Sequence, residues 1–284
     1  MTVSASRSSR HRLRRTAKSL VREWNRLGSQ MRFYVTTLTG IPDAVMHYRS
    51  ELLRVIAQMG FGAGTLAVIG GTVVIVGFLA MTTGAIVAVQ GYNQFASVGV
   101  EALTGFASAF FNTREIQPGT VMVALAATVG AGATAQLGAM RINEEIDALE
   151  VIGIRSVSYL ASTRVVAGVV VAIPLFCVGL ITAYLAARAG TTAIYGQGSG
   201  VYDHYFNTFL RPTDVLWSSF EVVVVALMIM LVCTYYGYNA RGGPAGVGEA
   251  VGRAVSASMV VASIAIVIMT LAIYGQSPNF HLAS

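Results

Sequence analysis

The sequence predicts an all-α polytopic membrane protein with about five transmembrane helices, preceded by amphipathic helices at the membrane surface. Of its 284 residues, 55% are hydrophobic and only 11% are charged, whereas soluble domains carry roughly 25% charged residues. The charges are also segregated. Five stretches contain no Asp, Glu, Lys or Arg, namely 55–100, 116–140, 165–187, 222–240 and 254–284. Each is about the length that crosses a bilayer as a helix, and lipid offers no partner for the backbone polar groups of other conformations.

The elements follow in order along the chain. Residues 1–12 are rich in Ser and Arg and predict a disordered basic tail. Residues 13–60 predict interfacial helices, because apolar residues recur every three or four positions with basic residues between them, and a second, shorter helix follows Pro42. A soluble helix pair that needs a partner is the alternative. Residues 61–284 form the transmembrane domain. We expect its spans near 64–90, 117–138, 160–187, 215–238 and 255–275.

Basic residues set the expected orientation in the cell membrane. The segment before the first span holds 11 of the 19 Lys and Arg residues, and the connections on the same side raise the total to 16. Only Arg114, Arg188 and Arg211 fall on the other side. Cytoplasmic connections carry this excess, so we expect a cytoplasmic N-terminus and an extracytoplasmic C-terminus. The net charge of +6 then reflects topology and affinity for anionic membrane lipids, and no nucleic-acid partner is expected.

A short acidic segment, 141–153, connects the second and third predicted spans. Four carboxylates within seven residues are too many for a membrane-facing helix, so the segment projects into water or into a partner. Catalysis is disfavoured because no His, nucleophile or metal-ligand pattern lies nearby. A solvated acidic face is the plain alternative to a docking helix. The residues expected to make docking contacts are Arg141, Glu144, Glu145, Asp147, Leu149 and Glu150.

The chain lacks the residues for ATP hydrolysis of its own. Its single lysine is Lys18, so the glycine-rich loop 242–248 cannot be a Walker A motif. The four histidines lie far apart in sequence and show no metal-ligand spacing. We therefore expect no cofactor or metal on this chain, and any ATP and Mg²⁺ would be used by a separate ATPase.

Several motifs, in matching order, resemble the MlaE/YrbE family, the permease subunits of ATP-driven lipid transporters. Residues 135–153 are similar to the family pattern A-E-L-G-x-M-R-x-x-E-Q-I-D-A-L-E-V-M-G, and 114–118 (R-E-I-Q-P) are similar to its R-E-L-G-P. The motif Q-G-Y at 90–92 and the glycine-rich stretch 242–255 also match. The resemblance covers roughly residues 40–275.

The resemblance implies both a coupling segment and a lipid site. Residues 141–153 would couple to a cytoplasmic ABC-type ATPase dimer. Lipid would bind between permease subunits near the outer leaflet, with Arg114 holding a phosphate or carboxylate and Glu115 orienting the Arg114 side chain. A structural Arg–Glu pair is the alternative. The residues implied for lipid binding are Tyr92, Arg114, Glu115, Leu79, Ile86 and Val89.

Three positions depart from the family pattern. Thr128 stands where the family usually has Arg, Gln136 where it has Glu, and Glu221 where Lys is common. Joint loss of the first two charges is consistent with the cost of a lone ion in lipid. Glu221 is a possible intramembrane polar site, facing a polar cavity or a charge on a partner permease, or snorkelling to the surface.

The departures and the long basic N-terminus most resemble a YrbE B-type subunit of an actinobacterial Mce lipid transport system. That resemblance implies a heterodimer with an A-type paralogue and extracytoplasmic Mce-type lipid-binding proteins. Two other functions stay open, a non-transporting membrane scaffold and a stand-alone secondary carrier. Co-purification distinguishes the three, because only the permease requires an ATPase and a second permease.

Overall fold

The computed structural model describes residues 27–61 and 71–275. The predicted tail 1–12 and the first part of the predicted interfacial helices, up to residue 26, lie outside these residues. All regular elements within them are helical. Within the described residues, five helical stretches are long and apolar enough to cross a membrane, Gly71–Ala96, Glu101–Ile142, Val157–Ile194, Pro212–Tyr238 and Gly243–Tyr274. The predicted fold class, an all-α polytopic membrane protein, is confirmed.

Some of these stretches are single helices and others are composites with wider, π-helical turns. The single spans are α5 (Gly71–Ala96), α12 (Pro212–Tyr238) and α13 (Gly243–Tyr274). The second span comprises η1 (Glu101–Leu103), α6 (Thr104–Ala107), η2 (Ser108–Ile116), α7 (Gln117–Leu125), η3 (Ala126–Gly130) and α8 (Ala131–Ile142), and the third comprises η4 (Val157–Ser162), α10 (Thr163–Ala189) and η5 (Gly190–Ile194). The shorter helices are α2 (Ile41–Met46), α3 (Arg49–Phe61), α9 (Glu145–Val151) and α11 (Ser199–Phe209).

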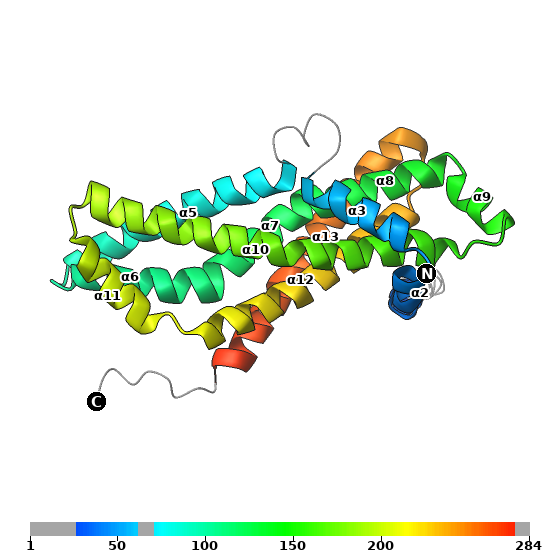
Figure 1. Cartoon of the computed structure of the whole chain (residues 1–284). Helices are drawn as coiled ribbons and strands as arrows, with labels where there is room; N and C mark the ends of the chain where they lie inside the picture. The colour runs from blue at the N-terminus through cyan, green and yellow to red at the C-terminus, as the bar shows by residue number, and fades with distance from the viewer. Residues whose placement is uncertain (1–26, 62–70, 276–284) are drawn as a thin grey trace, which may run out of the picture.

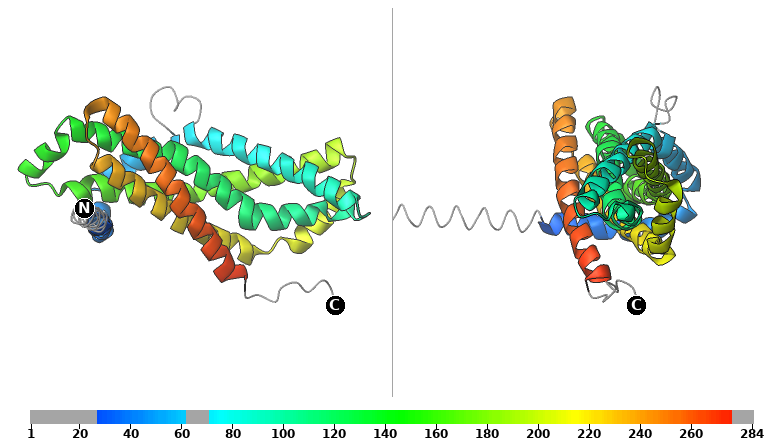
Figure 2. Two further views of the ribbon diagram at one scale, coloured as in Figure 1. Left: turned by 180° about the vertical axis from the view of Figure 1, so that it is seen from behind. Right: turned by 90° about the vertical axis from the view of Figure 1, so that its left-hand side faces the viewer.

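The helices form an elongated bundle with two distinct ends (Figure 1). One end holds α2, α9 and the connection between α12 and α13, and we call it the coupling end. The opposite end, which we call the far end, holds α6 and α11. The chain runs back and forth between them, and α13 crosses the bundle obliquely (Figure 2). This arrangement places α9 at the same end as the N-terminal helices, as the two spans between them require.

The core lies where α5, α10, α12 and α8 meet along the bundle. Small residues allow this close packing, as is usual where lipid gives helices no hydrophobic reason to associate. A Cβ atom on Gly84 of α5 would overlap the backbone of Ala183 in α10. Outside the spans, α3 buries Leu52, Val55 and Met59 in the same core, so this part of the predicted interfacial region packs on the bundle.

The helix boundaries differ from the expected spans at several places, and the fifth span begins at Gly243 instead of near residue 255. The described part of the first span runs from Gly71 to Ala96, beyond the expected end at residue 90. The second helix begins well before Pro118, which we expected to open it, and includes Arg114. Pro118 lies just after the wider turns of η2, and such π-helical turns are a usual place for a helix to depart from regular α-helical geometry. The charge of Arg114 is tolerated because it finds a partner, described below.

Candidate functional site: an acidic helix and three polar clusters

The acidic segment bends sharply before its helix begins. The helix α8 ends at Ile142, and Glu144 adopts a left-handed backbone with φ of 61°, which is uncommon for a residue other than glycine. The chain then turns into α9, whose seven residues end before Gly153 at φ of 83°. Arg141 therefore belongs to the end of α8, and the acidic helix is shorter than the predicted 141–153.

One apolar side chain anchors α9 to the bundle. Ile146 has 0% exposure and packs with Leu137 of α8 and Leu160 of η4. Leu149, one of the predicted docking residues, is half-buried against this cluster. Ile146 therefore packs α9 against the two spans that it connects.

A polar cluster holds the other end of α9. Glu150 accepts hydrogen bonds from Ser156 Oγ at 2.5 Å and from Tyr238 Oη at 3.2 Å, and the two hydroxyls lie 2.7 Å apart. Tyr238 ends α12, so a third transmembrane helix contacts the acidic segment. Arg141 Nη1 also lies 2.7 Å from Asp147 Oδ1. Sequence reasoning missed Ser156 and Tyr238.

The outward face of α9 carries exposed carboxylates and, next to them, two exposed apolar side chains. Glu144, Glu145 and Asp147 are exposed. Val151 and Ile152 follow them with 87% and 70% exposure. Figure 1 shows the helix projecting from the coupling end. An apolar pair next to three carboxylates is a composition suited to binding a partner, and sequence reasoning did not single out this pair.

The N-terminal helices brace the same end. Arg155 Nη1 lies 2.9 Å from Asp43 Oδ2 of α2. Ser162 Oγ of η4 donates to the Thr37 carbonyl oxygen at 2.7 Å, and the ring of Phe33 lies 5.3 Å from that of Tyr238. Residues 27–46 thus contact the segment that follows α9 and the end of α12.

Arg114, predicted to bind lipid, is held by a residue that the sequence did not suggest. Its Nη2 and Nε atoms lie 2.7 and 3.1 Å from Asp214 Oδ2. Its guanidinium lies over the rings of Phe110 at 4.2 Å and Tyr274 at 4.4 Å. Glu115 is exposed, and the ion pair of Arg114 is with Asp214 and not with Glu115.

The other predicted lipid residues lie along α5. Tyr92 stacks on Tyr195 with a centroid distance of 4.2 Å, a cluster separate from the one around Arg114. Ile86 and Val89 are exposed on the outward face of α5, whereas Leu79 packs against the core. The structure therefore places the six residues in more than one environment.

Glu221 lies inside the chain. Its side chain has 0% exposure, and Oε1 accepts a long hydrogen bond of 3.5 Å from Thr270 of α13. Within the described residues Oε2 has no hydrogen-bond partner. The carboxyl group therefore faces α13, and it neither reaches the surface nor points outward to a partner permease.

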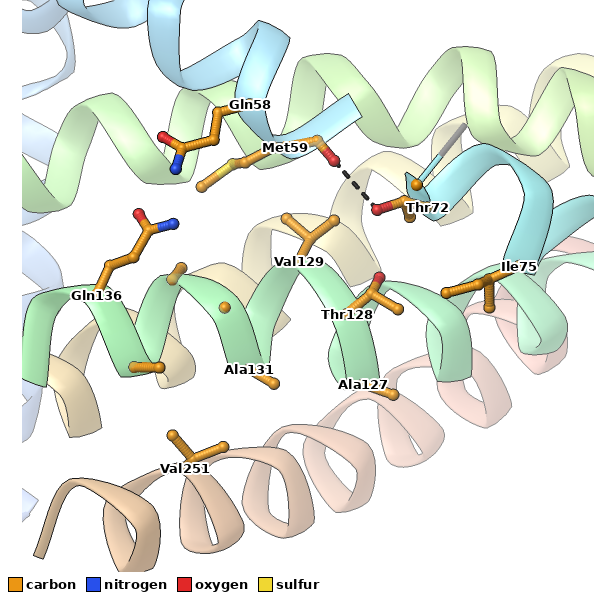
Figure 3. Close-up of a pocket in the computed structure, with 14 residues that line it drawn as sticks. Gln58, Met59, Thr72, Ile75, Ala127, Thr128, Val129, Ala131, Gln136 and Val251 are labelled. Carbon is orange, nitrogen blue, oxygen red and sulfur yellow. Dashed lines mark hydrogen bonds between the residues drawn. The ribbon is translucent and has the colours of Figure 1, made fainter. Parts of the chain in front are cut away.

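A pocket of about 490 Å³ opens between α3, α5, the η3–α8 stretch and α13. Gln58 and Gln136 face each other at one end of it, and Thr128 lies further along (Figure 3). Two of the three departures from the family pattern, Thr128 and Gln136, therefore line one cavity. The rest of its wall is mainly apolar, including Met59, Ile75 and Val129.

Comparisons with known proteins agree with this architecture. A family model described as Permease MlaE matches residues 61–272. A probable ABC transporter permease protein of Rickettsia bellii is 31% identical over 202 residues, which cover 67% of this chain and 73% of that protein.

More distant relatives occur in photosynthetic organisms. A probable ABC transporter permease protein of Synechocystis, slr1045, is 26% identical over 62% of this chain and 67% of its own length. The chloroplast protein TRIGALACTOSYLDIACYLGLYCEROL 1 of Arabidopsis thaliana is 28% identical over 61% of this chain, and the match spans about half of that relative, 49%. The long match to the family model places this chain in the MlaE permease family.

Proposed function

We propose that this chain is the permease subunit of an ATP-driven lipid transporter. It passes hydrophobic lipid, such as a fatty acid or sterol, between extracytoplasmic Mce-type proteins and the inner membrane. A separate ABC-type ATPase drives it through residues 141–153. The observation that carries the proposal is the geometry of α9, which is exposed on one face and fixed to three transmembrane helices on the other.

The contacts of α9 explain how ATP hydrolysis would reach the spans. The ATPase grips the exposed carboxylates and the apolar pair Val151 and Ile152. Ile146 then moves α8 and η4, and Glu150 moves the end of α12 through Tyr238. A partner shifts a conformational equilibrium only by contacts that differ between its states. Segments η3 and η4 contribute wider turns to spans two and three, and such turns are frequent at functional sites.

The proposed partners follow from the two ends of the bundle. The coupling end faces the cytoplasm, because Arg141, Arg155, Arg241 and Arg253 lie there. The ATPase dimer binds ATP and Mg²⁺ on that side. A second YrbE-type permease, of the A type, completes a heterodimer in the membrane, and Mce-type proteins deliver or receive lipid at the far end.

Arg114 remains the proposed lipid contact of the far half. A lipid carboxylate or phosphate would approach the guanidinium beside Asp214, with the exposed Glu115 orienting the Arg114 side chain, and Tyr92, in its separate cluster with Tyr195, would contact another part of the lipid. Charge-assisted hydrogen bonds of this kind are strong. Leu79, Ile86 and Val89 would contact acyl chains.

The test replaces Glu144, Glu145 and Asp147 together with Ala in the assembled complex. We expect the ATPase co-purifying with the permease to fall about tenfold, the loss expected when a few charged hydrogen bonds disappear. The matched control is Glu249→Ala, an exposed acid at the start of α13, which should leave the complex intact.

A single variant separates charge from backbone strain. Glu144→Asn removes the carboxylate but tolerates the left-handed conformation, so it should weaken association while α9 keeps its position. Undiminished ATPase association and lipid transport in the triple variant would show that α9 is not the docking helix. A chain that purifies with neither an ATPase nor a second permease would instead support a stand-alone carrier.

A further inference from the structure

Arg164, at the start of α10, is a deeply buried cation with only neutral hydrogen-bond partners. It has 4% exposure. Its Nη1 donates to the Leu160 carbonyl oxygen at 3.0 Å, and its Nη2 reaches Gln136 Oε1 at 3.5 Å. Within the described residues its Nε has no hydrogen-bond partner. A guanidinium stays protonated in proteins, so this charge cannot be removed by loss of a proton.

The nearby charged groups do not neutralise Arg164. Glu51 and Arg54 of α3 act on it with opposite signs. They are already paired to each other, with Arg54 donating to Glu51 at 2.6 and 2.9 Å. Among the residues that the structure describes, no carboxylate lies within 4.0 Å of Arg164. A buried charge without a counter-ion is costly, so this position favours binding of an external anion.

The side chain of Gln136 connects Arg164 with the pocket described above, and Met140 Sδ contacts the same guanidinium nitrogen at 3.9 Å. Gln136 Oε1 is directed to Arg164, and the same side chain lines the pocket opposite Gln58 (Figure 3). The 3.5 Å contact is at the long limit of a hydrogen bond, so it holds Gln136 weakly. A rotation of this side chain would expose the cation to a ligand.

The shape and lining of the pocket indicate an amphipathic ligand. Its volume of about 490 Å³ lies within the range of small-molecule sites. The two amide side chains, Gln58 and Gln136, lie at one end. The hydroxyls of Thr72 and Thr128 along the wall already donate to backbone carbonyl oxygens, and the remaining wall is mainly apolar. A single oxyanion attached to an alkyl chain matches this division better than a free inorganic anion does.

We propose that this pocket binds an anionic single-chain lipid, with its carboxylate or phosphate oxygens on Arg164 and its chain along Met59, Ile75 and Val129. The site lies in the coupling half of the bundle, apart from Arg114. It extends the proposed function by naming a charge class of lipid. Gln136 acts as the displaceable cover, and its neutral amide leaves Arg164 available.

The decisive variant is Gln136→Glu in the complete transporter, reconstituted in lipid nanodiscs. The new carboxylate is nearly the same shape and supplies Arg164 with an internal counter-ion, so the chain should fold and melt at a higher temperature. A photoactivatable fatty acid should label wild-type peptides containing Gln58 or residues 127–136. In the variant we expect labelling to need about tenfold more probe, because a charge-assisted hydrogen bond is lost.

Two controls make the result specific. Gln94→Glu places the same change on an exposed position near the end of α5, and labelling of the pocket should not change. A fatty alcohol with the same photoreactive chain should label the wild-type pocket about tenfold less than the acid.

Arg164→Gln tests the same site directly. It should also reduce labelling by the acid, and its folding can be checked by the same melting measurement.

Several outcomes would overturn the proposal. Equal labelling by acid and alcohol would show that charge does not matter, and unchanged labelling in Gln136→Glu would remove Arg164 from the site. Competition by inorganic phosphate as strong as by fatty acid would show a simple anion site without lipid selectivity. ATPase association is measured on the same preparations. A failure of the proposed docking of the ATPase on α9 can therefore be distinguished from a failure of the proposed lipid site.

Discussion

The two halves of the bundle treat their charged residues differently. In the far half, Arg114 has Asp214 at 2.7 Å, and Arg188 has Asp203 at 2.7 Å. In the coupling half, Arg164 is more deeply buried than Arg114 yet has no carboxylate partner in the described residues, although surface pairs such as Arg155 with Asp43 occur there too. The difference therefore concerns the buried arginines: the far half neutralises its buried arginine within the chain, whereas the coupling half leaves its buried arginine without a carboxylate partner.

Asp214→Asn should have the largest effect, because it leaves Arg114, like Arg164, without a carboxylate partner. Both side chains of the pair are only 13% exposed. Removing one member of a largely buried pair leaves the other charge uncompensated, and we expect a loss of about 3 kcal/mol in the free energy of unfolding. The measurement is denaturant unfolding of the purified chain in detergent.

The control for this change is Asp203→Asn, which breaks the exposed pair of the far half. Exposed pairs contribute little, so this variant should stay close to wild type. Combining Asp214→Asn with Arg114→Gln should recover part of the loss, because no lone charge remains. If the two Asp→Asn variants are equally stable, the Arg114–Asp214 pair is not a structural element of the far half.

Ile146→Ala should have a smaller and more local effect. It removes the one fully buried side chain of α9, with a cost of about 2 kcal/mol to docking of α9 on α8 and η4. We expect faster amide hydrogen exchange in α9 and an ATPase rate that no longer responds to lipid, while the far half keeps its protection.

Ile152→Ala is the matched control, since Ile152 is 70% exposed. It should leave amide exchange in α9 unchanged and weaken only binding of the ATPase. Unchanged exchange in Ile146→Ala would mean that α9 is held by the Glu150 cluster alone. The pair of variants thus separates the inner face of α9 from its outer face.

The sequence predicted features that follow from local composition. Charge-free runs gave five spans, and four carboxylates between two of them gave an exposed acidic helix. Contacts between distant segments were not predictable in this way. Arg114 meets Asp214 across 100 positions, and Tyr238 meets Glu150 across 88. Nothing in either local pattern names the partner.

Two further misses have different causes. Arg164 borders the charge-free run 165–187, so it was counted as a connection residue when orientation was assigned, although it is buried. The left-handed turn at Glu144 could not be predicted, because the sequence lacks the Gly that usually marks such a backbone conformation. Because of that turn the acidic helix has only seven residues, and Arg141 belongs to the end of α8. Both misses concern where a charged residue lies relative to a helix end.

The smallest expected effect is a pH dependence of the far end. The hydrogen bond from Arg188 lowers the pKa of Asp203 below its ordinary value of 3.8. The stabilising contribution of this pair, which joins α10 to α11, is therefore fully present above that ordinary pKa. It is lost as the pH falls through the lower pKa of the folded state. Because the pair is exposed, the contribution is small. Melting temperatures of wild type and Arg188→Gln should differ slightly at about pH 7, and the difference should shrink as the pH falls below the ordinary pKa of Asp203, 3.8. A difference that grows on acidification would mean that Asp203 is stabilised in its protonated form, and the far half would then resemble the coupling half in leaving a charge unsatisfied.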